Sequence, residues 1–405
     1  MYGKSSASIA LGFALAAVAL CCAILVAITL KPPQCTEVVP PVDEPAIITK
    51  GVIFIHGGRF IDQDQVLILL NATGRERPRV GIIPTASDDP INTGLRWVRY
   101  LEKFGAEAVL LNITVDNCVW TSHDKDLVEL VRSLDAVLFL GGFPDRYVKC
   151  FLPNGLPTPV LSAIWELYLR GGVVAGRSAG AVFLSDYGVL GGFDVGYELV
   201  RGFGILGHKL AVDVHYLASP STIRLFEVMT KVPVSTGLAI GEDMAVLCRG
   251  TTCRVIGPGP VLLLVYEGLE DEKYVFSLSY LTDGDEFTLA GDHLRAAPGK
   301  TLLSKGLLPG EPSTDLGTAA TSPEDWIVRA FDRLINSSRV QLKLIPLRGG
   351  ATVYYVELSR TPGTAIYDSG VSGRYGLTRY TVLRLRLAIS RVPEVPRIPM
   401  PGAQT

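Results

Sequence analysis

Residues 172–181 read Gly-Val-Val-Ala-Gly-Arg-Ser-Ala-Gly-Ala, a stretch that predicts a strand, a turn and a helix in succession. Val173–Ala175 is a short apolar run typical of a buried strand. It ends at a Gly-x-Ser-x-Gly pentapeptide, Gly176–Gly180, and the alanine-rich residues 179–184 can begin a helix. This is the arrangement of a nucleophile elbow, with the serine at the apex of a tight turn. Because the pentapeptide also occurs in ordinary loops, the chain must also supply a base, an acid and an oxyanion site.

The bulk composition favours a large globular protein. With 405 residues, 48% of them apolar, the chain can bury a substantial core and is expected to form more than one structural unit. Its formal net charge of −2 gives no reason to expect a nucleic-acid partner. The cysteines and histidines form no Cys-x-x-Cys motif or cluster, so neither a metal nor another cofactor is expected.

The N-terminal segment predicts membrane attachment. Ile9–Ile28 is a run of twenty uncharged residues, long enough to cross a bilayer as a helix. A cleaved signal peptide is the alternative, although its apolar core normally spans about 7–15 residues. We therefore expect a transmembrane anchor over residues 1–30 and an extended, proline-rich linker over residues 31–50.

The cysteines and glycosylation sequons favour a compartment outside the cytoplasm. Cys248 and Cys253 flank a hairpin loop, and Cys118 and Cys150 both follow predicted strands, so each pair could form a disulfide; buried free thiols are the alternative. Three Asn-x-Ser/Thr sequons point the same way. The expected localisation is a single-pass membrane protein with an extracytoplasmic catalytic domain, or a secreted protein if the anchor is cleaved.

The middle of the chain predicts an α/β domain. Between residues 51 and 267, short apolar runs alternate with amphipathic segments, which indicates a parallel sheet covered by helices on both faces. Ligands bind such sheets beyond the carboxyl ends of the strands, where we expect Ser178. From residue 268 the pattern changes, which predicts an α+β extension over residues 268–391 and a proline-rich tail over residues 392–405.

Two histidines follow predicted strands and are candidates for the base that activates Ser178. His56 lies in a His-Gly-Gly turn and could reach the site. His215 ends a strand downstream of the serine and is the better candidate. A histidine with a purely structural role is the alternative for each.

Three motifs in order resemble the S51 family of serine peptidases, which includes cyanophycinase and the aspartyl dipeptidase called peptidase E. They are Gly176–Ala181, Val212–Tyr216 and Gly237–Ala245. The resemblance covers roughly residues 51–267 and is closer to the cyanophycinase branch. It implies a sheet like that of flavodoxin and of class I glutamine amidotransferases, in agreement with the pattern of strands and helices.

The resemblance also implies the catalytic residues. Ser178 falls on the family's nucleophile, His215 on its base and Glu242 on the acid that orients the base. A serine hydroxyl needs such a neutral imidazole to remove its proton, and a carboxylate stabilises the imidazolium that forms. Other carboxylates that could take the place of the acid are Asp243, Asp213 and Asp194.

The oxyanion site and the substrate contacts are implied in the same way. The backbone N–H groups of Ala179 and Gly142 would bind the oxyanion. The chain departs from the family after its Gly-Gly turn, and Arg177 stands where a small hydroxyl residue is usual. Asp145, Arg146 and Arg177 are therefore candidate substrate-binding residues, since arginine can hold a carboxylate through two hydrogen bonds. Surface salt bridges are the alternative role.

The implied function is a serine-type peptidase that hydrolyses a peptide or isopeptide bond next to an aspartyl residue through an acyl-enzyme. Its expected partners are a peptide or aspartyl-containing polymer and, through the N-terminal helix, a membrane; a homodimer is left open. A catalytically inactive S51-like protein that binds a ligand or a surface is the alternative. A lipase-type hydrolase is disfavoured because its acid would precede its histidine.

Overall fold

The computed structural model describes residues 51–393, except for 191–197, 208, 309–312, 321–324, 346–351 and 371–378. The expected anchor and linker lie outside these residues, as does Asp194. Of the expected tail over residues 392–405, only residues 392 and 393 are described, and they end a strand instead of belonging to the tail. The expected localisation as a single-pass membrane protein is corrected: no helix within the described ranges is long and apolar enough to cross a membrane. The described residues all fall within one compact unit.

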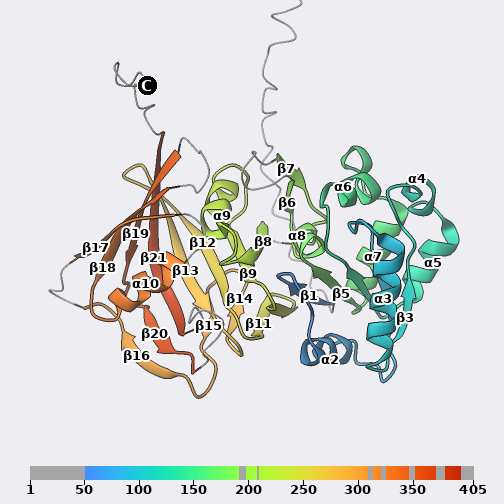
Figure 1. Cartoon of the computed structure of the whole chain (residues 1–405), viewed down its shortest axis with the longest axis horizontal. Coiled ribbons are helices and arrows are strands. Elements are labelled where there is room, and N and C mark those ends of the chain that lie inside the picture. Colours follow the sequence, from blue (N-terminus) through green and yellow to red (C-terminus); the bar gives the residue numbers. More distant parts are fainter. Residues whose placement is uncertain are drawn as a thin grey trace, which may run out of the picture. The chain divides into compact units, whose positions relative to one another are not determined.

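A nine-stranded sheet contains the expected parallel strands. Its strands are β1 (Val52–His56), β2 (Arg79–Ile83), β3 (Glu107–Leu110), β4 (Ala136–Phe139), β5 (Val173–Arg177), β10 (Ala245–Arg249), β11 (Thr252–Ile256), β14 (Glu286–Thr288) and β15 (Leu294–Arg295). They lie in the order β15-β14-β11-β10-β1-β5-β4-β2-β3 (Figure 1). The strands from β1 to β3 in this order run parallel, whereas β10, β11, β14 and β15 pair antiparallel.

Helices cover both faces of this sheet, because its strands are apolar on both sides. Val52 and Phe54 of β1 belong to one core, with α2 (Gln63–Asn71) and α3 (Pro90–Glu102). Ile53 and Ile55 face the opposite core. The helices on that side are α4 (Cys118–Thr121), α5 (Lys125–Ser133), α6 (Asp145–Phe151), α7 (Pro159–Leu169) and α8 (Ala179–Phe183), with a short 3₁₀ helix at Pro153–Gly155. The predicted mixed α/β architecture is therefore present.

The two cysteine pairs whose state the sequence left open both form disulfides. Cys118 and Cys150 join α4 to α6 across 32 residues of sequence. Cys248 and Cys253 lie directly opposite each other in the hairpin of β10 and β11. The first bond therefore closes a long loop, and the second closes a short one.

A second sheet of twelve strands takes in most of the chain after Ser178. Its strands are β6 (Tyr187–Leu190), β7 (Glu198–Arg201), β8 (Leu210–Tyr216), β9 (Thr236–Gly241), β12 (Val261–Glu270), β13 (Lys273–Leu281), β16 (Thr301–Lys305), β17 (Ser313–Ala320), β18 (Arg339–Ile345), β19 (Thr352–Ser359), β20 (Ala365–Asp368) and β21 (Tyr380–Pro393). The order is β17-β18-β19-β21-β13-β12-β9-β8-β6-β7, with β20 on β21 and β16 on β20. The helices α9 (Ser221–Met229) and α10 (Asp325–Leu334) pack on one face.

The two sheets share a core. Val212, Leu238 and Leu263 of the second sheet belong to the same buried cluster as the helices on one face of the first. The expected boundary near residue 268 falls inside β12, which pairs with β9 on one side and β13 on the other. Strands beyond this point continue both sheets, so they complete the structure on which the site is built.

Candidate active site

Ser178 stands at the turn between β5 and α8. Its φ of 52° and ψ of −120° are strained for a residue with a side chain, as expected at a nucleophile elbow. The turn needs glycine close by: a Cβ on Gly180 would lie 2.4 Å from the carbonyl oxygen of Phe139. The sequence therefore forms the predicted elbow, with the serine at its apex.

His215 reaches the serine because β8 bulges at this residue. Its φ is 59°, and the pairing of β8 with β9 shifts register between Val214 and Tyr216. Its Nε2 lies 3.0 Å from Ser178 Oγ. The backbone is held on both sides, because His215 N–H donates to Gly57 O at 3.0 Å and Ser219 Oγ donates to His215 O at 3.0 Å.

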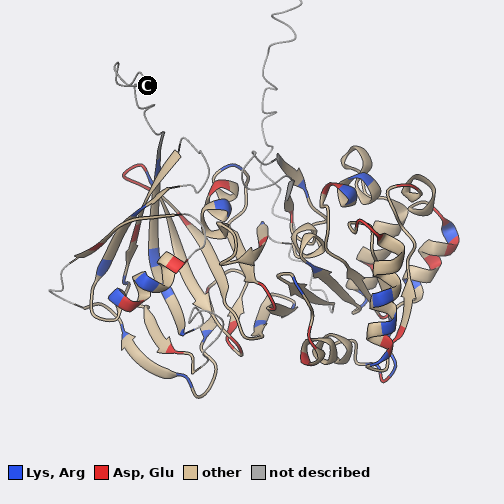
Figure 2. Ribbon diagram, in the orientation of Figure 1, with Lys and Arg blue, Asp and Glu red and all other residues tan. Residues whose placement is uncertain are grey.

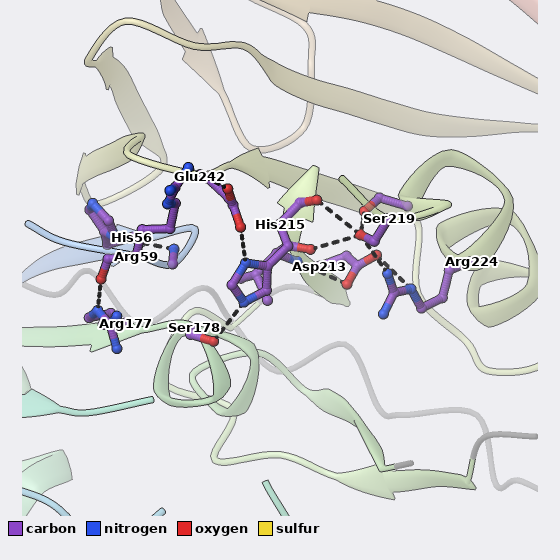
Figure 3. A network of polar contacts seen from close by, with 12 residues as sticks. His56, Arg59, Arg177, Ser178, Asp213, His215, Ser219, Arg224 and Glu242 are labelled. Carbon is purple, nitrogen blue, oxygen red and sulfur yellow. Dashed lines mark hydrogen bonds and ion pairs between the residues drawn. The ribbon is translucent and has the colours of Figure 1, made fainter. Parts of the chain in front are cut away.

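Glu242, directly after β9, completes a chain of three side chains. Its Oε1 lies 3.1 Å from Nδ1 of His215, and Figure 3 shows His215 between Glu242 and Ser178. The side chains of His215 and Glu242 are 35% and 30% exposed, so the group is open to a substrate. The structure thus brings together the three residues predicted as a triad.

The alternative acids have other contacts. Asp213 is buried and lies 2.8 Å from Nε of Arg224, away from the histidine ring (Figure 3). Burial raises the pKa of Asp213, and the positive charge of Arg224 opposes this shift. The carbonyl oxygen of Asp243 accepts a hydrogen bond from Gln65 at 2.8 Å. Neither carboxylate has a contact with His215 like that of Glu242.

His56 is not placed to act as the base. It is fully buried at the end of β1, and its Nδ1 accepts a hydrogen bond from Gly58 N–H at 3.2 Å. Burial, and then the nearby charge of Arg177, lower its pKa to about 3. A histidine that stays neutral and closed to solvent is suited to a structural role, whereas His215 contacts the serine directly.

Two short turns lie next to the serine. A Cβ on Gly141 would come within 2.9 Å of Ser178 Cβ, and the next residue, Gly142, has a φ of 144°. Phe143 N–H donates to Ala86 O at 2.7 Å and fixes this turn. Ala179 is the first residue of α8, so its N–H has no partner within the helix. Ala179 and the turn at Gly141 therefore lie next to Ser178.

The candidate substrate-binding residues differ in the contacts that they already make within the protein. Arg146 donates to Ser87 O, its Nη2 lies 3.3 Å from Asp88, and its guanidinium lies 4.7 Å above the ring of Phe143. Asp145 is exposed at the start of α6. Arg177 is better placed, because it directly precedes the nucleophile and lines a pocket. Burial lowers the pKa of its guanidinium.

Arg59 is a site residue that sequence reasoning missed. Its Nη1 lies 3.3 Å from Glu242 Oε2, and its carbonyl oxygen accepts a hydrogen bond from Arg177 Nε (Figure 3). The only signal in the sequence is its position directly after the His-Gly-Gly turn. The guanidinium thus contacts the same carboxylate that lies against the His215 ring.

No family model matches the chain, but comparisons with known proteins find cyanophycinases and peptidases among its relatives. A cyanophycinase of Geminocystis herdmanii is 28% identical over 193 residues, which are 46% of this chain and 68% of the relative. A cyanophycinase of Nostoc sp. is 28% identical over 229 residues, 53% of this chain and 74% of the relative. An uncharacterised peptidase of Bacillus subtilis, YgaJ, is 30% identical over 145 residues, 35% of this chain and 58% of the relative.

Among solved structures, a peptidase from an acI-B1 Actinobacterium is similar with a TM-score of 0.47 and 22% identity. The match covers 59% of this chain and 96% of that one. The curated relatives, rather than this distant structural likeness, confirm the resemblance predicted from the motifs.

Proposed function

Since the chain is similar to the S51 family of peptidases, we propose that it is a serine-type peptidase that hydrolyses a peptide or isopeptide bond next to an aspartyl residue. The observation that carries this proposal is the hydrogen-bonded chain from Ser178 to His215 to Glu242, with contacts of 3.0 and 3.1 Å. Cyanophycinases and a peptidase among its relatives support the reaction class.

The geometry of the three side chains supports the following mechanism. His215 Nε2 removes the proton of Ser178 Oγ as this oxygen attacks the scissile carbonyl. Glu242 accepts a hydrogen bond from Nδ1–H and stabilises the imidazolium. The N–H groups of Ala179 and Gly142 bind the oxyanion, where losing one such donor costs about 10²–10³ in rate.

The second half of the reaction reverses these roles. His215 gives its proton to the leaving amine, which leaves an acyl group bonded to Ser178 Oγ. Water, activated by the same imidazole, then hydrolyses this ester and releases the acid. The resemblance to the family also implies that the sheet has the flavodoxin-type arrangement common to its members.

A ligand-binding protein without catalytic activity is the alternative function. It is disfavoured because such a protein has no physical need for a strained serine held 3.0 Å from an imidazole. The observation that supports this alternative is the sequence after the Gly141-Gly142 turn, which departs from the family pattern. There Arg146 is held by Ser87 and Asp88.

The test uses the full-length chain with a fluorophosphonate probe and with peptides that carry an aspartyl residue at the scissile bond. Ser178→Ala and His215→Ala should each lower kcat by about 10⁶, and Glu242→Gln by about 10⁴, because the three residues act as a unit. Ser162→Ala is the matched control, because the Ser162 hydroxyl donates to the carbonyl oxygen of Thr158, the N-cap of α7, away from Ser178. Equal labelling of the wild type and Ser178→Ala would refute the nucleophile; a mild effect of His215→Ala beside a severe one of His56→Ala would refute the base.

A further inference from the structure

A basic pocket of about 450 Å³ opens beside the candidate active site. Five of its lining side chains are cationic, namely Arg59, Arg96, Arg99, Lys103 and Arg177, and no acidic residue is among those that line it in the described part of the chain. A concave site with charges of one sign concentrates ligands of the opposite sign. The lining therefore selects an anionic ligand.

The charges on one wall come from a single helix face. Arg96, Arg99 and Lys103 follow one another at spacings of three and four residues along and just beyond α3, which places them as neighbours. Basic positions recur along α3 in Figure 2. Like charges at these spacings repel each other. Within the described ranges none of the three forms an ion pair with a carboxylate, although Arg96 Nη2 donates to Thr93 Oγ1 at 2.8 Å. Their positive charges are therefore available to an anionic ligand.

Aromatic side chains make the rest of the pocket suitable for a peptide. Phe60 and Tyr100 have ring centroids 4.9 Å apart, and Trp97 meets Tyr100 edge to face at 5.7 Å. The hydroxyl of Tyr100 donates to the carbonyl oxygen of Ile61 at 3.0 Å and so fixes this wall. The rings offer apolar contact to the methylene groups and backbone of a peptide while the cations face its carboxylates.

Two of the five cations connect the pocket to the catalytic residues. Arg177 directly precedes Ser178, and Arg59 forms an ion pair of 3.3 Å with Glu242. A ligand that contacts these two guanidiniums therefore lies next to the bond under attack. Because the pocket lies next to the residues proposed to cleave a peptide bond, a peptide is a better ligand than a nucleic acid. The net charge of −2 agrees with this choice.

We propose that the basic pocket binds an acidic segment of the peptide substrate, with two or more carboxylates beside the scissile bond. This inference rests on the proposed peptidase function and adds a preference to it. Peptides with several unbalanced carboxylates are preferred, and peptides whose carboxylates are balanced by guanidinium groups are bound less well, because the five cations repel the added positive charge.

Binding can be measured apart from catalysis. In the full-length Ser178→Ala chain, calorimetry compares tetra-aspartate with tetra-asparagine and with a tetrathymidylate. Tetra-aspartate should bind, and the double substitution Arg99→Gln and Lys103→Gln should weaken it about tenfold, a change typical of losing two partly exposed ion pairs. The control double substitution, Lys125→Gln and Arg254→Gln, removes two exposed cations that do not line the pocket.

Each result has a definite meaning. Tighter binding of tetra-aspartate than of tetra-asparagine, lost in the pocket variant and kept in the control, supports the inference. Equal binding in both variants, no binding of tetra-aspartate, or tighter binding of tetrathymidylate overturns it.

Turnover separates this inference from the proposed function. Wild type should cleave an aspartyl peptide with an acidic flank at a higher kcat/KM than its amidated counterpart, and the ratio should fall in the pocket variant. If the wild type cleaves both peptides with equal kcat/KM, the pocket inference is overturned while the proposed peptidase function stands. Anion binding without any turnover that depends on Ser178 would overturn the peptidase function.

Discussion

Replacing Gly58 by alanine should disable the candidate site by displacing its base. Gly58 has a φ of 134°, and a Cβ added there would lie 2.3 Å from Cε1 and 2.7 Å from Nδ1 of the His215 ring. Ordinary contacts begin near 3.4 Å, so the imidazole must move by about 1 Å, which takes Nε2 away from its position 3.0 Å from Ser178 Oγ. A misplacement of this size costs about 10² in rate.

Backbone strain accompanies this collision and must be measured separately. Gly268 is the matched control, because its φ is 144° and a Cβ there would meet nothing within 4 Å. Each alanine substitution should lower the free energy of unfolding by about 1–3 kcal/mol through backbone strain. Only Gly58→Ala should lower kcat and slow the reaction of Ser178 with a fluorophosphonate.

The assay combines thermal unfolding of both variants with kcat and labelling rates at a temperature where both are folded. Comparable stability losses with a rate loss confined to Gly58→Ala would support the arrangement of the base. Wild-type labelling by a folded Gly58→Ala protein would refute it, because the His215 ring could not then lie where this structure has it.

Two further predictions concern stability. Because burial lowers the pKa of His56 to about 3, the unfolded chain gains a proton near pH 6.5 that the folded chain does not bind until the pH is far lower. Between pH 7 and pH 5, this residue alone should therefore lower the free energy of unfolding by about 2 kcal/mol. Urea titrations of the His56→Gln variant should not show this loss. In the same assay, replacing Cys118 and Cys150, which are 32 residues apart, by alanine should lower the free energy of unfolding by about 3–4 kcal/mol. Replacing Cys248 and Cys253, which are 5 residues apart, should lower it by about 2 kcal/mol, because the closed loop is shorter. Equal losses would contradict the loop-entropy reasoning.

Local patterns were sufficient to predict the parallel strands of the first sheet and the serine, but not the antiparallel strands that extend this sheet. Apolar runs such as Val52–Ile55 recur between amphipathic segments, and this periodicity depends only on neighbouring residues. The Gly-x-Ser-x-Gly turn is equally local, so Ser178 could be placed at a sheet edge. His215 and Glu242 required the resemblance to a family, since neither residue has a diagnostic neighbourhood of its own.

Features that depend on distant contacts could not be predicted. Regular alternation along a strand would put Asp213 and His215 on one face. The bulge after Val214 instead separates them, and Asp213 faces Arg224. The ion pair of Arg59 with Glu242 joins residues 183 positions apart. Pairing of β21 with β13 likewise depends on partners more than a hundred residues apart in the chain, which periodicity does not specify.

The candidate triad is divided between the two sheets, with Ser178 on the first and both His215 and Glu242 on the second. During synthesis the nucleophile therefore leaves the ribosome before its base and its acid. The sheet that holds them gains β21, its strand from Tyr380 to Pro393, only after nearly all the described chain has been made. The three side chains therefore come within hydrogen-bond distance of one another only when both sheets have formed.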